Sequence, residues 1–226
     1  MRNLLPFIAA ALLLPACATA RTNSRQRPMM VVIGDSVAEG YGVKPSEAFP
    51  ALLTDKINER GWPIDVVLAA HTGDTVREAY DRNIDVLKKP CDMLVVELGA
   101  NDAFRRLPPD ETQKDLERLL SLAYKQNRRL RILIIGFRSP AEWGDYSRRF
   151  NAIFPRIAFQ YRTAYLPFVL DDVVSEPALT LADHIHPNVL GHQQIAQRVW
   201  EGLDPILRKI LARYGIATAA KSAPKK

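Results

Sequence analysis

The sequence predicts an α/β fold in which helices cover both faces of a five-stranded parallel sheet. Three observations support it: short apolar runs alternate with longer segments of helical periodicity, the runs are apolar almost throughout, and helix-start residues recur between them. Near-continuous apolar character is typical of strands that are covered on both faces. The expected strands are residues 30–33, 64–69, 93–98, 131–135 and 163–166.

The expected helices each follow a residue whose side chain can accept a hydrogen bond from an unpaired N–H group of the first turn. Leu116, Leu119 and Leu120 recur at helical spacing and predict an apolar face that packs on the sheet. The caps and helices are Ser46 before 47–60, Asp74 before 75–87, Asp110 before 111–126, Asp145 before 146–160 and Asn188 before 189–202.

The charge of the chain is concentrated at its two ends. The net charge is +6, but seven of the 31 basic residues and none of the 25 acidic residues lie before residue 28 or after residue 220. The region between them therefore carries 24 basic and 25 acidic residues. A nucleic-acid-binding face needs a basic stripe on the fold itself, so we expect no nucleic-acid partner. Without repeats or a change in composition, one domain at 30–214 is expected, followed by a basic tail at 215–226.

The first 20 residues are interpreted as a signal peptide. Arg2 precedes the apolar residues 4–14, which are too few to span a bilayer, because a spanning helix needs about 20. The run ends in Leu14-Pro15-Ala16-Cys17, which resembles the lipobox of bacterial lipoproteins, whereas Ala18-Thr19-Ala20 offers an ordinary cleavage site. Residues 21–29 would form a polar tether. We expect an exported protein of the bacterial cell envelope, either anchored to a membrane through lipidated Cys17 or periplasmic, with its oligomeric state open.

Cysteine usage leaves no intramolecular disulfide. Cys17 and Cys91 are the only cysteines, and Cys17 is either acylated or removed with the leader. We therefore expect Cys91, beside a strand start, to be a small buried hydrophobic residue.

Residues that could take part in catalysis follow the ends of the expected strands. Ser36 comes directly after the first strand, Gly73 after the second and Asn101 after the third, while His186 precedes the last helix. Because ligands bind beyond the carboxyl ends of the strands in such sheets, we expect these four residues to meet at one rim.

The residues at this rim have the chemistry of a hydrolase. A serine hydroxyl is a poor nucleophile that needs a base within hydrogen-bond reach, and the base needs a third group to orient it. Asp183 and His186 can supply both functions from one loop, which gives Ser36, Asp183 and His186 as candidate catalytic residues. Acyl transfer also needs donors for the oxyanion. The candidates are the N–H group of Ser36, the N–H group of Gly73 and the side-chain amide of Asn101.

Four stretches together resemble the sequence blocks of the SGNH (GDSL) hydrolase family: Gly34-Asp35-Ser36-Val37-Ala38-Glu39-Gly40, Gly73, Gly99-Ala100-Asn101-Asp102 and Asp183-His184-Ile185-His186. The similarity covers nearly all of residues 30–205. It is greatest to the acyl-CoA thioesterase I, lysophospholipase L1 and arylesterase group. The resemblance implies a flavodoxin-like three-layer α/β/α sandwich, the same triad and oxyanion hole, and neither a metal nor a cofactor.

Two residues depart from the family pattern. His184 stands where relatives often have glycine, so its loop is expected to be stiffer or its pocket more polar. Ala100 replaces a common second glycine before Asn101, which is expected to narrow the approach to that donor. Neither change removes a catalytic atom.

The expected activity is hydrolysis of carboxylic esters or thioesters of short to medium acyl chains, through an acyl-Ser36 intermediate. An O-acetyl esterase acting on cell-envelope polysaccharide is an alternative, as is an envelope binding module that keeps the fold without turnover. A zinc site at Asp183, His184 and His186 would lack an evident fourth ligand. The glycine-rich stretch 34–40 lacks the lysine of a phosphate-binding loop.

Several other residues at the rim have structural interpretations. Asp35 and Asp102 are expected to fix their loops through hydrogen bonds to the backbone. His71 and His192 are interpreted as structural or exposed. Two apolar loop segments, one at 104–109 with Phe104 and one at 140–146 with Trp143, would either line an acyl pocket or pack onto the body.

Overall fold

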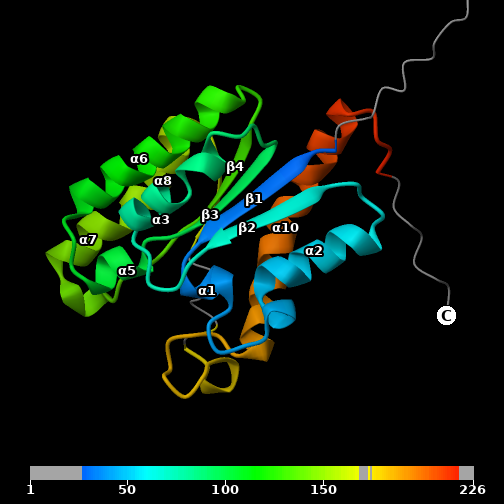
Figure 1. Cartoon of the computed structure of the whole chain (residues 1–226). Helices are drawn as coiled ribbons and strands as arrows, with labels where there is room; N and C mark the ends of the chain where they lie inside the picture. The colour runs from blue at the N-terminus through cyan, green and yellow to red at the C-terminus, as the bar shows by residue number, and fades with distance from the viewer. Residues whose placement is uncertain (1–26, 168–172, 174, 219–226) are drawn as a thin grey trace, which may run out of the picture.

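A five-stranded parallel sheet forms the centre of the molecule in the computed structural model, which describes residues 27–167, 173 and 175–218 (Figure 1). Its strand order, β2-β1-β3-β4-β5, is that of flavodoxin-like folds. The predicted α/β/α sandwich is therefore confirmed, and each strand lies within two residues of its predicted bounds. The strands are β1 (Met29–Gly34), β2 (Asp65–Ala70), β3 (Met93–Glu97), β4 (Arg131–Ile135) and β5 (Ala164–Leu166).

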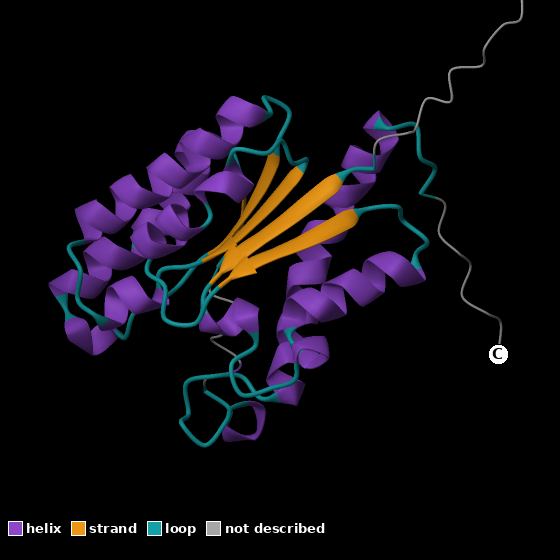
Figure 2. Ribbon diagram, in the orientation of Figure 1, coloured by secondary structure: helices purple, strands orange, loops and turns teal. Residues whose placement is uncertain are grey.

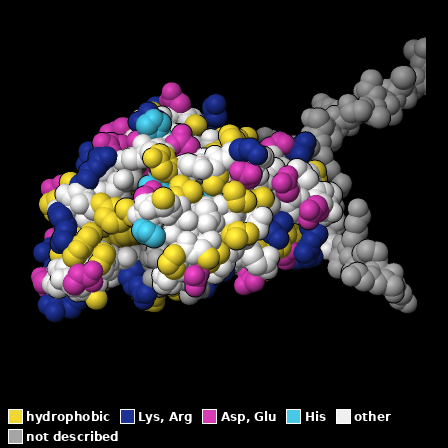
Figure 3. All heavy atoms as spheres, turned by 90° about the horizontal axis from the view of Figure 1, so that it is seen from below, with side chains coloured by type: hydrophobic (Ala, Val, Ile, Leu, Met, Phe, Trp, Pro, Cys, Tyr) yellow, Lys and Arg dark blue, Asp and Glu magenta, His cyan; other side chains and the backbone are white. Residues whose placement is uncertain are grey.

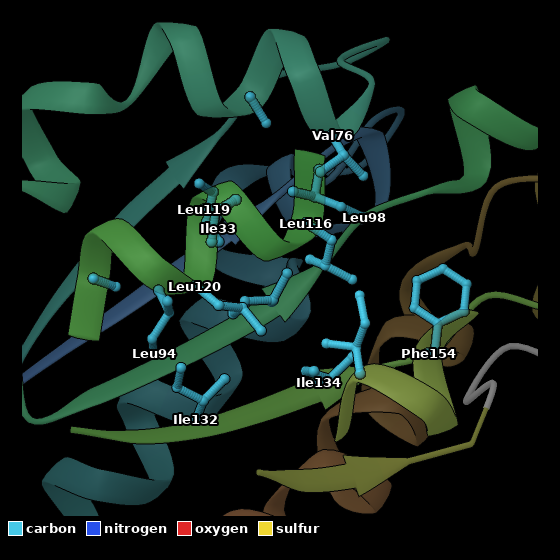
Figure 4. Close-up of a cluster of buried hydrophobic side chains, with 14 of the residues drawn as sticks. Ile33, Val76, Leu94, Leu98, Leu116, Leu119, Leu120, Ile132, Ile134 and Phe154 are labelled. Atoms are coloured by element: carbon cyan, nitrogen blue, oxygen red, sulfur yellow. The ribbon is translucent and has the colours of Figure 1, made fainter. Parts of the chain in front are cut away.

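Helices cover both faces of this sheet (Figure 2). On one face lie α2 (Phe49–Glu59) and the long α10 (Val189–Arg213), whose apolar residues share a core with β1 and β3. On the other face lie α3 (Val76–Arg82), α6 (Pro109–Gln126) and α8 (Ile153–Tyr161). Figure 4 shows valine, leucine and phenylalanine side chains of these helices beside leucine and isoleucine side chains of the strands. The remaining elements are α1 (Ser36–Glu39), η1 (Pro45–Glu47), α4 (Ile84–Leu87), α5 (Ala100–Phe104), η2 (Ala141–Trp143), α7 (Asp145–Asn151) and η3 (Pro177–Leu179).

The helix starts agree less well with the sequence. Asn188 caps α10 as predicted, accepting hydrogen bonds from the N–H groups of Leu190 and Gly191. Thr75 caps α3 in a capping box with Glu78. In α2 and α6 a proline at the first or second position sets the helical φ without any side-chain cap. The predicted caps that were wrong are Ser46, Asp74, Asp110 and Asp145.

Two predicted helices are divided and one is longer than expected. The predicted helix at 75–87 is interrupted at Asn83, whose side-chain amide donates to the carbonyls of Ala69 and Ala79. The predicted helix at 146–160 breaks between α7 and α8, because Pro155 has no N–H to donate to the preceding turn. The last helix continues through Gly202, where the missing side chain makes room for Leu166 of β5.

Cys91 is buried, as predicted, and burial raises the pKa of its thiol to about 12. Among the helices of the described residues, none has both the length and the apolar character needed to cross a membrane.

Candidate active site

The candidate site lies beyond the carboxyl ends of β1 and β3. These two strands are neighbours, and the chain leaves them toward opposite faces of the sheet, which is the switch point where ligands bind in such folds. Ser36 is the first residue of α1, directly after β1. Asp35 caps this short helix by accepting a hydrogen bond from the N–H of Val37 at 3.3 Å, so the sequence Gly-Asp-Ser fixes the serine at the strand end.

Ser36, His186 and Asp183 form one continuous hydrogen-bonded chain. The distance from His186 Nε2 to Ser36 Oγ is 3.1 Å, and that from His186 Nδ1 to Asp183 Oδ2 is 2.7 Å. With Asp183 ionised, Nδ1 carries the ring proton and donates a hydrogen bond to the carboxylate. Nε2 then has the free lone pair that faces the serine hydroxyl, so a base and a nucleophile are already in contact.

The other oxygen of Asp183 organises the loop that carries the histidine. Asp183 Oδ1 accepts hydrogen bonds from the N–H groups of Ile185 at 2.9 Å and His186 at 3.0 Å. Desolvation opposes ionisation, but the hydrogen bonds from His186 and Ile185 outweigh it and lower the pKa of Asp183 to about 2. His184, which directly follows Asp183, has a φ of 57°, a left-handed conformation that glycine adopts more readily. The loop therefore keeps the glycine-like turn even though its residue has a side chain.

Tyr41 also touches the site, and the sequence analysis did not find it. Its ring centroid lies 4.5 Å from that of His186, at an interplanar angle of 41°. This contact packs an aromatic ring against the imidazole. An aromatic residue in a polar turn after α1 gives no sequence signal of its own.

Two backbone N–H groups are available for an oxyanion near Ser36. Within the part of the chain that the structure describes, neither the N–H of Ser36 nor that of Gly73 donates to a protein acceptor. The turn around Gly73 is held from both sides: Thr72 N–H donates to Glu39 Oε2 at 2.6 Å, and Arg105 donates to the Gly73 carbonyl at 2.7 Å. Gly73 has a φ of 89°, which favours glycine at this position.

The side-chain amide of Asn101 lies between the same loops. Asn101 Nδ2 donates to Asp35 Oδ2 at 3.2 Å and to the backbone carbonyl of Asp74 at 3.0 Å. These bonds fix the amide beside Ser36, with which it lines the same cavity. Both hydrogens of the amide are engaged by these two acceptors, so an oxyanion at this position would have to replace one of them or share its hydrogen.

Buried carboxyl groups lie behind these donors. Burial is the largest cause that raises the pKa of Asp35 to about 7 and that of Glu97 well above its ordinary value. Burial also raises the pKa of Asp102, which accepts hydrogen bonds from Val76 N–H and the Thr112 hydroxyl. Asp35 and Asp102 thus make the loop-fixing bonds expected from the sequence, whereas Glu97 was not expected to belong to the site.

A largely apolar cavity of about 290 Å³ opens next to Ser36. The aromatic ring of Phe104 packs against those of Phe137 and Trp143, with centroids 5.7 and 6.1 Å apart, and the guanidinium of Arg106 lies 3.7 Å above Trp143. Figure 3 views the molecule from below and shows histidine and hydrophobic side chains exposed among scattered charges. The cavity is lined by Ser36, Val37, Ala100, Asn101, Phe104, Phe137, Arg138, Pro140, His184, Ile185 and His186.

The two apolar loop segments expected at the rim have different positions. Phe104 and Pro140 line the cavity, whereas Trp143 packs behind Phe104. Of the other histidines, His192 is fully buried and His71 is half exposed beside Asp74. In the described ranges of the chain, no three His, Cys, Asp or Glu side chains converge to hold a metal ion.

The parallel flavodoxin-like sheet carries a hydrogen-bonded serine, histidine and aspartate beyond the carboxyl ends of its strands. This combination of fold and site places the protein in the class of α/β serine hydrolases. Comparison with known proteins then identifies the family. The model of the GDSL-like Lipase/Acylhydrolase family matches residues 32–194. This chain belongs to that family and is a GDSL-type serine hydrolase.

Individual relatives agree with this assignment. Esterase TesA of Pseudomonas aeruginosa is 30% identical over 202 residues, which cover 87% of this chain and 99% of the relative. Thioesterase 1/protease 1/lysophospholipase L1 of Escherichia coli is 33% identical over 205 residues, which cover 90% and 93%. The crystal structure of TesA superposes with a TM-score of 0.73 at 29% identity, covering 79% of this chain and 99% of that one.

Proposed function

We propose that the protein hydrolyses carboxylic esters and thioesters through an acyl-enzyme formed on Ser36. The observation that carries the proposal is the chain of contacts from Ser36 Oγ to His186 Nε2 at 3.1 Å and from His186 Nδ1 to Asp183 at 2.7 Å. Such an arrangement activates a hydroxyl and orients its base without further movement. The esterase and thioesterase names of the two relatives support the same reaction class.

The proposed reaction is a double displacement. Ser36 Oγ attacks the carbonyl carbon of the substrate while His186 Nε2 takes the hydroxyl proton. The N–H groups of Ser36 and Gly73 and the amide of Asn101 hold the oxygen that becomes negative. The tetrahedral intermediate collapses, and the leaving alcohol or thiol takes the proton from Nε2. Water then releases the acid by the same steps, with His186 again as base and Asp183 orienting its ring.

The cavity supports acyl chains of short to medium length. Its volume of about 290 Å³ lies near the lower end of ligand pockets, which span roughly 300–1,000 Å³. Phe104, Phe137 and Pro140 give it an apolar wall that suits a hydrocarbon chain and offers little to a sugar. An O-acetyl esterase would instead show a sharp preference for acetyl groups.

The direct test compares the wild type with Ser36→Ala on p-nitrophenyl esters from acetate to decanoate and on an octanoyl thioester. We expect the substitution to lower kcat by about 10⁴-fold or more, because it removes the nucleophile. Ser121→Ala, which changes a serine that contacts Tyr161 far from the site, is the matched control. Equal rates for the wild type and Ser36→Ala would end the proposal.

A fluorophosphonate probe separates the enzyme from a binding module of the same fold. It is expected to label Ser36 in the wild type and in Ser121→Ala, and to leave Ser36→Ala unlabelled. No labelling of the wild type would favour the binding module. A rate profile confined to acetate would favour the O-acetyl esterase.

We also propose export to the cell envelope, with 1–20 as a signal peptide, 21–29 as a tether, 30–214 as the hydrolase domain and 215–226 as a basic tail. Residues 1–26 and 219–226 lie outside the described residues, so the sequence alone supports this part. Mass spectrometry of the mature protein tests it: an acylated Cys17 at the N-terminus indicates lipid anchoring, and a free terminus after Ala20 indicates simple secretion. An intact Met1 in the purified envelope protein contradicts both.

A further inference from the structure

Glu97 is a buried acid directly behind the turn that carries Ser36. It is the last residue of β3 and stands opposite Gly34 of β1 in the sheet register. A Cβ atom on Gly34 would lie 3.1 Å from Glu97 Oε2 and 2.9 Å from the Glu97 carbonyl, so the glycine makes room for this carboxyl group. The backbone N–H groups of Asp35 and Ala38 face the carboxyl group of Glu97. Its side chain therefore braces the backbone on both sides of Ser36.

A second buried carboxyl group, that of Asp35, lies beside it. Asp35 is fully buried and Glu97 is 8% exposed, and after burial the negative charge of Asp35 is a further cause that raises the pKa of Glu97. Two carboxylates that share one buried site cannot both be ionised at moderate cost, so such a pair retains a proton. Asp74 and Asp102 also face Asp35 from the neighbouring loops and add to the negative charge.

The hydrogen bonds decide which of the two carboxyl groups holds that proton. Both oxygens of Asp35 accept hydrogen bonds, Oδ1 from Val37 N–H and Oδ2 from the Asn101 amide, which favours its ionised form. The N–H groups of Asp35 and Ala38 stabilise a charged Glu97 as well, but burial opposes that charge more strongly. In addition, Glu97 Oε2 is buried without a hydrogen-bond partner, which is costly for a charged oxygen. Arg82, which contacts the neighbouring acid Asp74, pairs with that carboxylate at 2.8 Å. The proton is therefore placed on Glu97.

We propose that Glu97 is a positioning residue that works as a neutral carboxylic acid: it braces the turn of residues 34–38 and leaves Asp35 ionised to hold the Asn101 amide. The inference rests on the proposed function, in which Ser36 and Asn101 act on the substrate. Ionisation of Glu97 would place a second buried charge behind the nucleophile. The burial that raises its pKa well above the ordinary value acts in the same direction as this geometry.

Three variants test the proposal. Glu97→Gln keeps the shape and the neutral state, Glu97→Leu removes the polar brace, and Glu59→Gln is a matched control on the exposed surface of α2. We expect Glu97→Gln to keep kcat on p-nitrophenyl butyrate within about threefold of the wild type, and to keep activity to higher pH. Glu97→Leu is expected to lose about tenfold or more in kcat with little change in KM, because it displaces donors and leaves the acyl pocket intact. Equal losses in Glu97→Gln and Glu97→Leu would overturn the proposal, as would an unchanged kcat in Glu97→Leu.

A second measurement does not depend on activity. At pH 7 the infrared spectrum of the wild type is expected to contain the C=O band of a protonated carboxylic acid, which Glu97→Gln lacks and Glu59→Gln retains. An acid whose pKa is raised by folding costs stability as the pH rises above its unfolded value. The stability advantage of Glu97→Gln over the wild type should therefore increase with pH. A wild type without the infrared band overturns the inference even if Ser36 proves to be the nucleophile, so the two proposals fail separately.

Discussion

Two histidines near the site have opposite environments at the scale of single residues. His186 has a polar partner on each ring nitrogen, the Asp183 carboxylate on Nδ1 and the Ser36 hydroxyl on Nε2, and its side chain is 21% exposed. His192 is fully buried: its Nδ1 accepts a hydrogen bond from Phe49 N–H at 3.2 Å, and its Nε2 has no partner among the described residues. The first environment suits proton transfer, and the second holds a neutral ring that fixes the start of α2.

His192 predicts a measurable pH dependence of stability. Burial lowers its pKa from 6.5 to about 4, so the unfolded chain binds a proton that the folded protein rejects. Its contribution to stability is present above pH 6.5 and is lost as the pH falls toward 4, by about 1.4 kcal/mol per pH unit. His192→Asn, which keeps an acceptor for Phe49 N–H, is expected to remove this slope, measured by urea unfolding between pH 4.5 and 7.5.

His71→Asn is the control for this measurement, because His71 is half exposed. Asp35 and Glu97 have the opposite effect on stability: because burial raises the pKa of both, their contribution makes the protein less stable as the pH rises over part of this range. The difference between each variant and the wild type isolates the histidine. A slope in His192→Asn that matches the wild type would contradict the prediction.

At the residue scale, the sequence predicted those site residues whose side chains have a recognisable chemical function. Ser36, Asp183 and His186, predicted from strand ends and loop spacing, lie in contact, and Asn101 lines the same cavity as Ser36 and His186. Gly73 lies in the loop whose Asp74 carbonyl accepts a hydrogen bond from the Asn101 amide. Their catalytic roles remain predictions that the proposed substitutions test. Tyr41 and Glu97 could not be predicted, because the roles of an aromatic residue in a turn and of an acid at a strand end depend on distant neighbours.

At the scale of elements, the turns after the strands set the geometry of the site. Gly99, between β3 and α5, has a φ of 112° and precedes Asn101 by two residues. A Cβ atom here would lie 2.8 Å from Cζ of Phe154, a fully buried ring of α8. The position of the Asn101 amide thus depends on a close contact between this turn and the helical layer.

Gly99→Ala is therefore expected to reduce both stability and activity. The left-handed φ costs roughly 1–2 kcal/mol for a residue with a Cβ atom, and the clash with Phe154 adds about 1–3 kcal/mol. Because the turn must shift to relieve the clash, kcat should also fall by more than about tenfold. Thermal unfolding and p-nitrophenyl butyrate kinetics give the two values.

Gly61→Ala separates the two causes. Gly61 also has a positive φ of 64°, but a Cβ atom there would meet nothing within 4 Å. Gly61→Ala should therefore lower the free energy of unfolding only by the cost of the left-handed φ, about 1 kcal/mol, and should leave kcat unchanged. Equal effects of the two substitutions would show that the contact with Phe154 does not hold the turn.

The sequence predicted elements better than their boundaries. Strands were found closely, because a strand buried on both faces must be apolar along its length. Helix starts depended on tertiary partners instead: Asp74 forms an ion pair with Arg82 and leaves the cap to Thr75. The continuation of α10 past Gly202 depends on close packing against Leu166, which lies 36 positions earlier in the chain.

At the scale of the whole molecule, both ends of the described chain lie at one pole and the candidate site lies at the other. Met29 N–H and the Tyr214 hydroxyl both donate to the carboxylate of Asp92, which directly precedes β3. Ser36 and Asn101 follow the opposite ends of β1 and β3, about 20 Å away for a six-residue strand. The length of the strands therefore separates the candidate site from both ends of the described chain.

We therefore expect substitutions in the basic tail to weaken membrane binding without changing catalysis. The basic residues of the tail should attract anionic lipid by about 1 kcal/mol each near a membrane surface. Replacing Lys221, Lys225 and Lys226 by glutamine in the otherwise unchanged chain should weaken sedimentation with phosphatidylserine vesicles, most clearly at low salt. The kcat/KM for soluble p-nitrophenyl butyrate should stay unchanged, because the nearly neutral body carries the site. A fall in kcat/KM, or vesicle binding that is insensitive to both the substitutions and salt, would contradict this separation of the two poles.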